Sequence, residues 1–212
     1  MGVSIAGVAA TLALSACGGG TRQDAQEQKG KFSVSVPTAS FPTAQHISGH
    51  YQLVIAVRND GRRTIPDVAV TICGASCRGG GTNAQGFASD ISGQYLANSA
   101  RPVWVVERGP GTCGLGCSGG GQGGGQGSGV TAYSNTWALG ALKPGKTMIF
   151  KWRVTAVSPG RHVITWQVAA GLNGRARAVL ANGAPAQKFT VTIDKAPPQS
   201  YVNNSGQIVT TQ

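Results

Sequence analysis

The stretch GALKPGKT, residues 140–147, has the spacing G-x-x-x-x-G-K-[ST] of loops that bind the phosphates of nucleotides. Such a loop requires a helix directly after its glycines, because the amides of the helix N-terminus hold the phosphates. Here the next residues, MIFKWRV, alternate between apolar and polar types, which predicts a strand. Pro144 also lacks an amide hydrogen. We therefore expect a turn at Pro144-Gly145, an ordinary surface lysine at Lys146, and no nucleotide binding.

Other residues with catalytic or metal-binding chemistry are few and scattered. The chain has 7 acidic residues and 3 histidines, and no two carboxylates share a motif. His46 and His50 stand four residues apart, as in a metal pair on a helix, but their surroundings FPTAQHISGHY are not helical. No G-x-S-x-G nucleophile motif occurs. The sequence predicts surface histidines, no metal site, no cofactor, and a protein that is not an enzyme.

The first 16 residues, MGVSIAGVAATLALSA, contain no charged side chain and precede Cys17. This apolar run is too short to span a bilayer comfortably but fits the core of a signal peptide, although no Lys or Arg opens it. The sequence Leu14-Ser15-Ala16-Cys17 resembles the lipobox of bacterial lipoproteins. The resemblance implies cleavage before Cys17 and transfer of a diacylglycerol to its sulfur.

Four further cysteines form two C-x3-C pairs, CGASC and CGLGC. Four thiolates could bind one zinc ion. In an exported chain, an even number of cysteines more often indicates disulfides. All three pairings of Cys73, Cys77, Cys113 and Cys117 stay open. We slightly prefer the local pairs Cys73–Cys77 and Cys113–Cys117, because nearby thiols meet most often.

From residue 32 onward, apolar residues recur at every second position in short runs. The runs are Phe32–Val36, Tyr51–Val57, Val68–Ile72, Met148–Val154, Ile164–Val168 and Phe189–Ile193. Alternation sends one set of side chains to a core and the other to water. Between runs lie turn residues, including Pro159-Gly160 and Asn173-Gly174, and Asn-Gly suits a tight hairpin. The pattern predicts an all-β protein, an antiparallel sandwich.

Two blocks of the chain resemble the immunoglobulin-like repeats of bacterial surface proteins, with adhesion-related repeats as the nearest type. In the first block, residues 32–72, an N-x-G turn at residues 59–61 follows the second strand. In the second block, residues 132–194, an L-x-PG turn at residues 142–145 opens a late strand. The resemblance implies an antiparallel immunoglobulin-like β-sandwich with a Gly/Cys-rich insertion at about residues 73–131.

The insertion ends in SGGGQGGGQGSG, residues 118–129, whose composition predicts a flexible segment. It also contains the apolar run Val103–Val106, where Trp104 is a candidate exposed binding aromatic because both faces of the run are apolar. The expected organisation is a signal peptide at residues 1–16, a lipid-anchored flexible tether at 17–30, the sandwich at 31–195 and a C-terminal tail at 196–212.

The formal charge of +11 produces a positive potential that attracts anionic partners without specifying one. The basic residues are spread along the sequence, apart from Arg62-Arg63, and no nucleic-acid motif is present. We expect a lipid-anchored protein on the extracytoplasmic face of the cell membrane, with a non-catalytic binding, adhesion or structural role. Its expected partners are the membrane, through lipidated Cys17, and anionic envelope polymers or a surface protein, not nucleic acid or nucleotide. The alternative is a carbohydrate-binding or periplasmic accessory module of an envelope enzyme or transporter, which a row of exposed tryptophans would favour.

Overall fold

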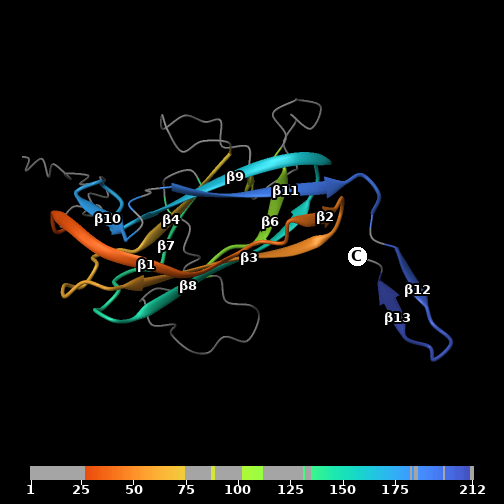
Figure 1. Cartoon of the computed structure of the whole chain (residues 1–212), viewed down its shortest axis with the longest axis horizontal. Helices are drawn as coiled ribbons and strands as arrows, with labels where there is room; N and C mark the ends of the chain where they lie inside the picture. The colour runs from red at the N-terminus through yellow and green to blue at the C-terminus, as the bar shows by residue number, and fades with distance from the viewer. Residues whose placement is uncertain are drawn as a thin grey trace, which may run out of the picture.

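The computed structural model of the chain describes residues 27–74, 87–88, 102–111, 131, 135–181, 183, 186–197 and 199–210. The described residues form strands and loops, in two packed sheets and a separate two-stranded sheet (Figure 1). The strands are β1 Gly30–Ser40, β2 Ala44–His46, β3 His50–Asn59, β4 Ala69–Cys73, β5 Phe87–Ala88, β6 Trp104–Arg108, β7 Thr136–Ala138, β8 Thr147–Ala156, β9 Gly160–Ala169, β10 Ala176–Leu180, β11 Ala186–Asp194, β12 Ser200–Val202 and β13 Ile208–Thr210. No helix within this described part is long and apolar enough to cross a membrane.

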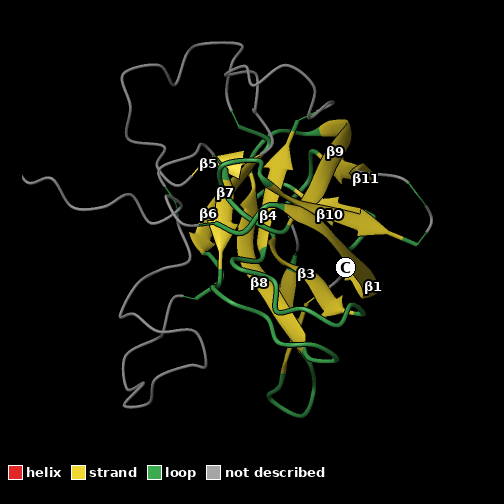
Figure 2. Ribbon diagram, turned by 90° about the vertical axis from the view of Figure 1, so that its left-hand side faces the viewer, coloured by secondary structure: helices red, strands yellow, loops and turns green. Residues whose placement is uncertain are grey.

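One layer of the sandwich is a six-stranded sheet with the order β10-β1-β3-β8-β6-β5. Its centre is the antiparallel pair β3 and β8, which runs in register from His50 opposite Thr155 to Arg58 opposite Thr147. The other layer is a five-stranded sheet with the order β2-β11-β9-β4-β7. Figure 2 shows β5 and β6 near one lateral edge of the sandwich and β1 near the opposite edge.

The core lies between the two sheets and consists of the inward-pointing residues of the alternating runs. In β8, Phe150, Trp152 and Val154 are fully buried while Lys151 and Arg153 are exposed. In β9, Ile164 and Trp166 are also buried, and Thr165 between them is buried at 9% exposure. The period-two pattern assigns the side chains of β8 correctly, because this strand has one face on the core and one face in water. β4 departs from this pattern, since Ala69, Val70, Ile72 and Cys73 are all buried.

The predicted all-β immunoglobulin-like sandwich is confirmed, and its central strand pairs are antiparallel. Its edges differ from the antiparallel prediction. β1 pairs with β10, β2 with β11, and β5 with β6 in parallel. The pairs of β1 with β10 and of β2 with β11 join strands nearly 150 residues apart, and β5 and β6 both lie within the insertion. Local alternation therefore carries no information about these pairings.

The predicted hairpin at Asn173-Gly174 is wrong. β9 pairs with β11 and β4 in one sheet, whereas β10 joins β1 in the other sheet. The turn therefore carries the chain from one layer to the other. Gly174 has a φ of 76°, but Asn173 is not among the residues with positive φ, so the two-residue hairpin turn does not form.

The segment GALKPGKT forms the predicted turn rather than a phosphate-binding loop. Gly145 has a φ of 70°, and β8 begins two residues later at Thr147. Leu142 is buried at 3% exposure and pairs with Ile65 in an isolated bridge, while Lys146 is exposed. A strand after the turn presents no helix N-terminus to a phosphate.

The folded domain begins before the position that the sequence suggests. Glu27 falls in the expected tether, yet only 8% of it is exposed. Its carboxylate accepts hydrogen bonds from the backbone N–H groups of Leu172 and Asn173, the latter at 3.1 Å. Residues 17–26 lie outside the described residues, so the tether itself stays a prediction.

The expected C-terminal tail contains a small hairpin. β12 and β13 pair antiparallel from Ser200 opposite Thr210 to Val202 opposite Ile208. The hairpin projects beyond the end of the sandwich (Figure 1). Its side chains Tyr201, Val202 and Ile208 are exposed.

Candidate functional site

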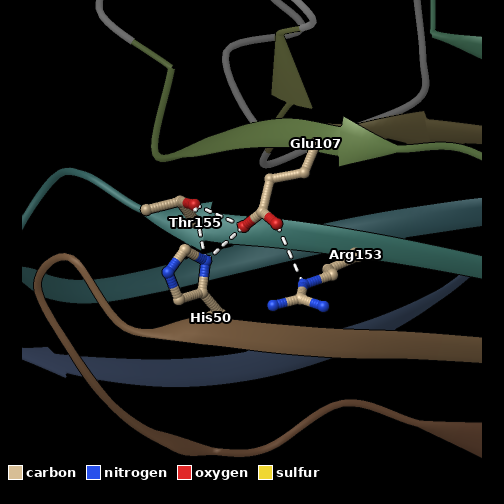
Figure 3. Close-up of polar contacts among 4 residues, drawn as sticks. All are labelled: His50, Glu107, Arg153 and Thr155. Atoms are coloured by element: carbon tan, nitrogen blue, oxygen red, sulfur yellow. Dashed lines mark hydrogen bonds and ion pairs between the residues drawn. The ribbon is translucent and has the colours of Figure 1, made fainter.

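A cluster of polar side chains lies on the outer face of the six-stranded sheet (Figure 3). We call it the polar cluster: His50 of β3, Glu107 of β6, and Arg153 and Thr155 of β8. His50 and Thr155 are register partners on adjacent strands. Between β6 and β8 the register shifts by one residue, since Val106 faces Val154 but Arg108 faces Arg153. Glu107 is the extra residue of this β-bulge, and a bulge re-aims a side chain in this way.

Glu107 is the centre of the polar cluster, and both of its carboxylate oxygens are occupied. Oε1 accepts a hydrogen bond from the hydroxyl of Thr155 at 2.5 Å and lies 2.5 Å from Nδ1 of His50. Oε2 lies 2.9 Å from Nε of Arg153. The Thr155 hydroxyl is also 3.2 Å from Nδ1 of His50. The four side chains therefore hold one another in a fixed arrangement.

The pKa of Glu107 is lowered by its neighbours. Partial burial alone would raise this pKa, because burial disfavours the charged form. Hydrogen bonds from Thr155 and His50, together with the charges of His50 and Arg153, outweigh burial and favour the carboxylate. Glu107 is therefore firmly ionised at neutral pH.

This geometry suits recognition better than proton transfer. A general acid or base works best with a pKa near the working pH, and the pKa of Glu107 moves away from it. The terminal guanidinium nitrogens of Arg153 are not occupied by Glu107, which contacts Nε. The side chains of Arg153 and His50 are 60% and 57% exposed. The polar cluster thus presents oriented donors to a polar or anionic partner.

Sequence reasoning did not find the polar cluster. It identified His50 only as a surface histidine, and the structure confirms that His50 is exposed at the start of a strand. Glu107, Arg153 and Thr155 carry no motif, and only the strand register brings them together. The alternation in β8 does indicate that Arg153 and Thr155 share the outer face.

Trp104 is not an exposed binding aromatic, so that prediction is wrong. Its exposure is 0%, and its ring packs edge-on against Phe41 and Phe87 at centroid distances of 5.3 and 6.1 Å. The indole Nε1 donates a hydrogen bond to Oε1 of Gln45 at 2.7 Å. Gln45 is buried at 2% exposure and also donates to the carbonyl of Pro42. The indole N–H of Trp104 therefore has a hydrogen-bond acceptor inside the core, which allows the whole side chain to be buried.

All four tryptophans are buried. Trp137, Trp152 and Trp166 have exposures of 5%, 0% and 1%, and Trp104 is likewise inside the core. No sheet face therefore carries the row of exposed tryptophans that would favour the carbohydrate-binding alternative.

The remaining predicted site residues fall mostly outside the described residues. Cys17, Cys77, Cys113 and Cys117 belong to this group. Cys73 is described: it ends β4 and is buried at 7% exposure. The two predicted disulfides and the lipidation of Cys17 stay predictions. Within the described residues, no group of three or more His, Cys, Asp or Glu side chains could hold a metal ion.

The fold and site define an immunoglobulin-like β-sandwich with a polar surface cluster. No protein-family model and no curated protein matches the chain. Among solved structures, it is similar to the crystal structure of a CARDB domain from Pyrococcus furiosus in complex with di-metal ions. The identity is 12% and the TM-score 0.40, covering 76% of this chain and 86% of that chain.

A solution NMR structure of the Pyrococcus furiosus domain gives 11% identity and a TM-score of 0.41, with 78% and 95% coverage. The Escherichia coli alpha-2-macroglobulin fragment from domain MG7 to the C-terminus gives 12% identity and a TM-score of 0.40. There 79% of this chain covers 17% of the fragment. At such identities and TM-scores, these likenesses assign no ligand, metal or site to this chain.

Proposed function

We propose that this chain is a lipid-anchored cell-envelope protein with a non-catalytic binding, adhesion or structural role. The sequence Leu14-Ser15-Ala16-Cys17 supports the anchor, because it resembles a lipobox. The polar cluster carries the binding part of the proposal. Its side chains are prearranged on an exposed sheet face, so a partner does not have to order them at an entropic cost.

The chemistry of the polar cluster favours binding over catalysis. Both carboxylate oxygens of Glu107 accept hydrogen bonds or ion pairs within the protein. The cluster lies on an exposed sheet face and is not enclosed, whereas enzymes exclude water around the groups that develop charge. Arg153 offers a planar fork of donors, which suits carboxylate or phosphate groups of a partner.

The alternative is a carbohydrate-binding accessory module of an envelope enzyme or transporter. One observation favours it, because Arg, Glu, His and Thr side chains are hydrogen-bonding groups that can meet sugar hydroxyls. The burial of all four tryptophans speaks against the common sugar-stacking arrangement. We therefore rank this alternative second.

The test uses a labelled Cys17→Ala chain, which carries no acyl group, on isolated cell-wall fractions, envelope proteins and a glycan array. We expect binding to at least one of these targets. A double variant His50→Ala/Arg153→Ala should reduce it by at least about tenfold, the loss expected for oriented charged contacts. The matched control is Arg161→Ala, an exposed arginine of β9 in the other sheet. Equal binding by the Cys17→Ala chain with and without the double substitution would contradict the assignment of binding to the polar cluster.

A further inference from the structure

One end of the sandwich gathers half of the basic residues of the chain. We call it the basic end, and it includes nine of the 18 Lys and Arg residues, all exposed. They are Lys29, Lys31, Arg58, Arg62, Arg63, Lys143, Lys146, Arg175 and Arg177. We propose that the basic end is a docking surface for anionic lipid headgroups, which seats the domain on the membrane. The orientation rests on the proposed anchor at Cys17.

The fold brings the basic residues together from four separate segments. Asn59 is fully buried and joins two of them, since its Nδ2 donates to the carbonyls of Arg63 and Leu142, both at 2.8 Å. The backbone N–H of Asn59 donates to the carbonyl of Lys146 at 3.0 Å. The turns at residues 59–66 and 140–146 are therefore adjacent.

The other two segments are the start of β1 and the start of β10. These strands pair in parallel, with Lys31 directly beside Arg177. Arg63 connects them to the turns, because its Nη2 donates to the carbonyl of Lys31 at 3.1 Å. Its guanidinium also lies 4.6 Å from the centre of the Phe32 ring. Figure 1 shows β10, the start of β1 and these turns at one end of the molecule.

Positive charge at the basic end is poorly neutralised within the protein. Among the described residues, Arg58 is the one member that forms an ion pair, with Asp60 at 3.5 Å. The other described carboxylates at this end, Glu27 and Asp67, are buried and bound to backbone N–H groups. Like charges on adjacent strands, such as Lys31 beside Arg177, repel each other and destabilise a sheet. An external anion would relieve this repulsion.

The shape of the basic end also admits a headgroup. An open hollow of about 450 Å³ is lined by Gln28, Arg63, Thr64 and Pro66. Arg63 is the charged member of this lining, and it is held in place by the Lys31 carbonyl and the Phe32 ring. A fixed guanidinium suits a phosphate group, because its planar fork matches the phosphate oxygens.

The position of the basic end favours a lipid surface as the partner. The described chain begins here, at Glu27, and Cys17 stands ten residues earlier. Ten extended residues reach at most about 35 Å, so a lipid on Cys17 would keep this end close to the bilayer. Basic residues bind an anionic membrane surface within roughly a Debye length, about 8 Å at physiological salt.

This placement would direct the polar cluster away from the membrane. β3 runs from His50, in the polar cluster, to Asn59, beside the basic end. Ten strand residues extend roughly 30 Å, so the two surfaces lie toward opposite ends of the sandwich. A membrane-seated domain would thus keep its recognition surface accessible.

The test measures co-sedimentation with lipid vesicles of the chain from residue 17 onward, which carries Cys17→Ala and lacks the predicted signal peptide at residues 1–16. The vesicles consist of phosphatidylcholine alone or of phosphatidylcholine mixed with phosphatidylglycerol. We expect binding only to the mixed vesicles, with loss at about 1 M salt, where the Debye length falls to about 3 Å. Because this chain carries no acyl group, vesicle binding can hold even if the proposed anchor fails.

Matched triple variants localise the binding. Lys31→Gln/Arg62→Gln/Arg177→Gln alters the basic end, and Lys151→Gln/Arg161→Gln/Lys195→Gln removes the same charge elsewhere. The first should weaken vesicle binding by about a hundredfold, at roughly fivefold for each residue, and the second by less than about threefold. The proposal would be overturned if the two triple variants lost vesicle binding equally, or if the chain bound neutral vesicles as well as anionic ones. Binding to isolated anionic wall polymers but not to vesicles would also overturn it.

A footprint on the Cys17→Ala chain keeps the proposal testable if a triple variant fails to fold. Amine-reactive labelling on mixed vesicles should be reduced at Lys29, Lys31, Lys143 and Lys146. Labelling of Lys151 and Lys195 should be unchanged. Equal protection of the two sets of lysines would exclude the basic end as the docking surface.

Discussion

At the residue scale, one hydrogen-bonded pair of buried polar side chains links the two sheets of the sandwich. Within the described residues, the buried indole N–H groups of Trp137, Trp152 and Trp166 have no such partner. Gln45 and Trp104 are both buried, and they share a hydrogen bond of 2.7 Å. Gln45 uses its amide nitrogen on the carbonyl of Pro42. The interaction fixes β2, at the edge of one sheet, against β6 of the other sheet.

Gln45→Leu should destabilise the protein by about 1–3 kcal/mol, because it leaves the indole N–H of Trp104 buried without this acceptor. Chemical denaturation with tryptophan fluorescence measures the free energy of unfolding. A double-mutant cycle with Trp104→Phe is the control, since the cost of Gln45→Leu should be smaller once the indole donor is gone. Purely additive effects would show that the hydrogen bond does not contribute.

Asp67 makes folding depend on pH. Burial raises its pKa, the hydrogen bond from the N–H of Gly140 lowers it, and the nearby charge of Glu27 raises it, with a net upward shift. The folded state therefore retains the proton more strongly than the unfolded state. Between the ordinary pKa of 3.8 and the raised value, stability falls as pH rises.

Asp67→Asn should remove the loss of stability at higher pH, because the amide oxygen carries no charge and can still accept the hydrogen bond from the N–H of Gly140. We expect the variant to gain thermal stability over wild type at pH 7 and to lose that advantage at about pH 3, where both side chains are neutral. Thermal unfolding across pH measures the difference. A constant difference at all pH values would mean that Asp67 does not titrate as described.

At the element scale, the turn at Pro144-Gly145 is held by its backbone and by Asn59. The N–H of Gly145 donates to the carbonyl of Asn59 at 2.8 Å, and the φ of Gly145 is 70°. A Cβ atom added at Gly145 would meet nothing within 4 Å. Glycine is therefore required at position 145 because of its positive φ, and not because a side chain would clash with its neighbours.

Gly145→Val should cost about 1–3 kcal/mol, because a β-branched residue resists positive φ. Lys146→Ala should change stability by less than about 0.5 kcal/mol, as expected for an exposed side chain. Urea unfolding of both variants provides the comparison. Calorimetric titration with Mg-ATP is the control, and micromolar binding that Lys146→Ala abolishes would contradict the turn interpretation.

The strands of the core could be predicted from the sequence, but the pairing of strands at the edges of the two sheets could not. Alternation in residues such as Phe150, Trp152 and Val154 depends on burial within one strand, so it is visible locally. The parallel pairing of β1 with β10 depends on residues nearly 150 positions apart. Asn173-Gly174 has the composition of a hairpin but connects two sheets, because the sheet to which the next strand belongs is a tertiary property.

At the scale of the whole molecule, the candidate surfaces arise from topology rather than motifs. Basic residues that look dispersed in the sequence meet at one end because four separate segments converge there. The polar cluster likewise depends on a bulge that local sequence does not reveal. The compartment stays a prediction, which rests on the resemblance of Leu14-Ser15-Ala16-Cys17 to a lipobox.

The proposed membrane attachment of the whole molecule depends on Cys17, whose sulfur would carry the lipid. A diacylglycerol supplies two acyl chains, and two chains anchor a protein stably where one binds only marginally. The basic end would add an electrostatic contact that depends on salt, whereas the acyl anchor would not. Washing membranes at high salt therefore separates the two contributions.

The most direct test is fractionation of bacterial cells that express the wild-type chain or Cys17→Ala, with mass spectrometry of the mature N-terminus. We predict that the wild-type chain begins at Cys17, carries a diacylglycerol, and stays in the membrane fraction after a wash at high salt. The Cys17→Ala chain should remain uncleaved or leave the membrane fraction. Equal processing and equal salt-resistant membrane attachment of the two chains would contradict the account.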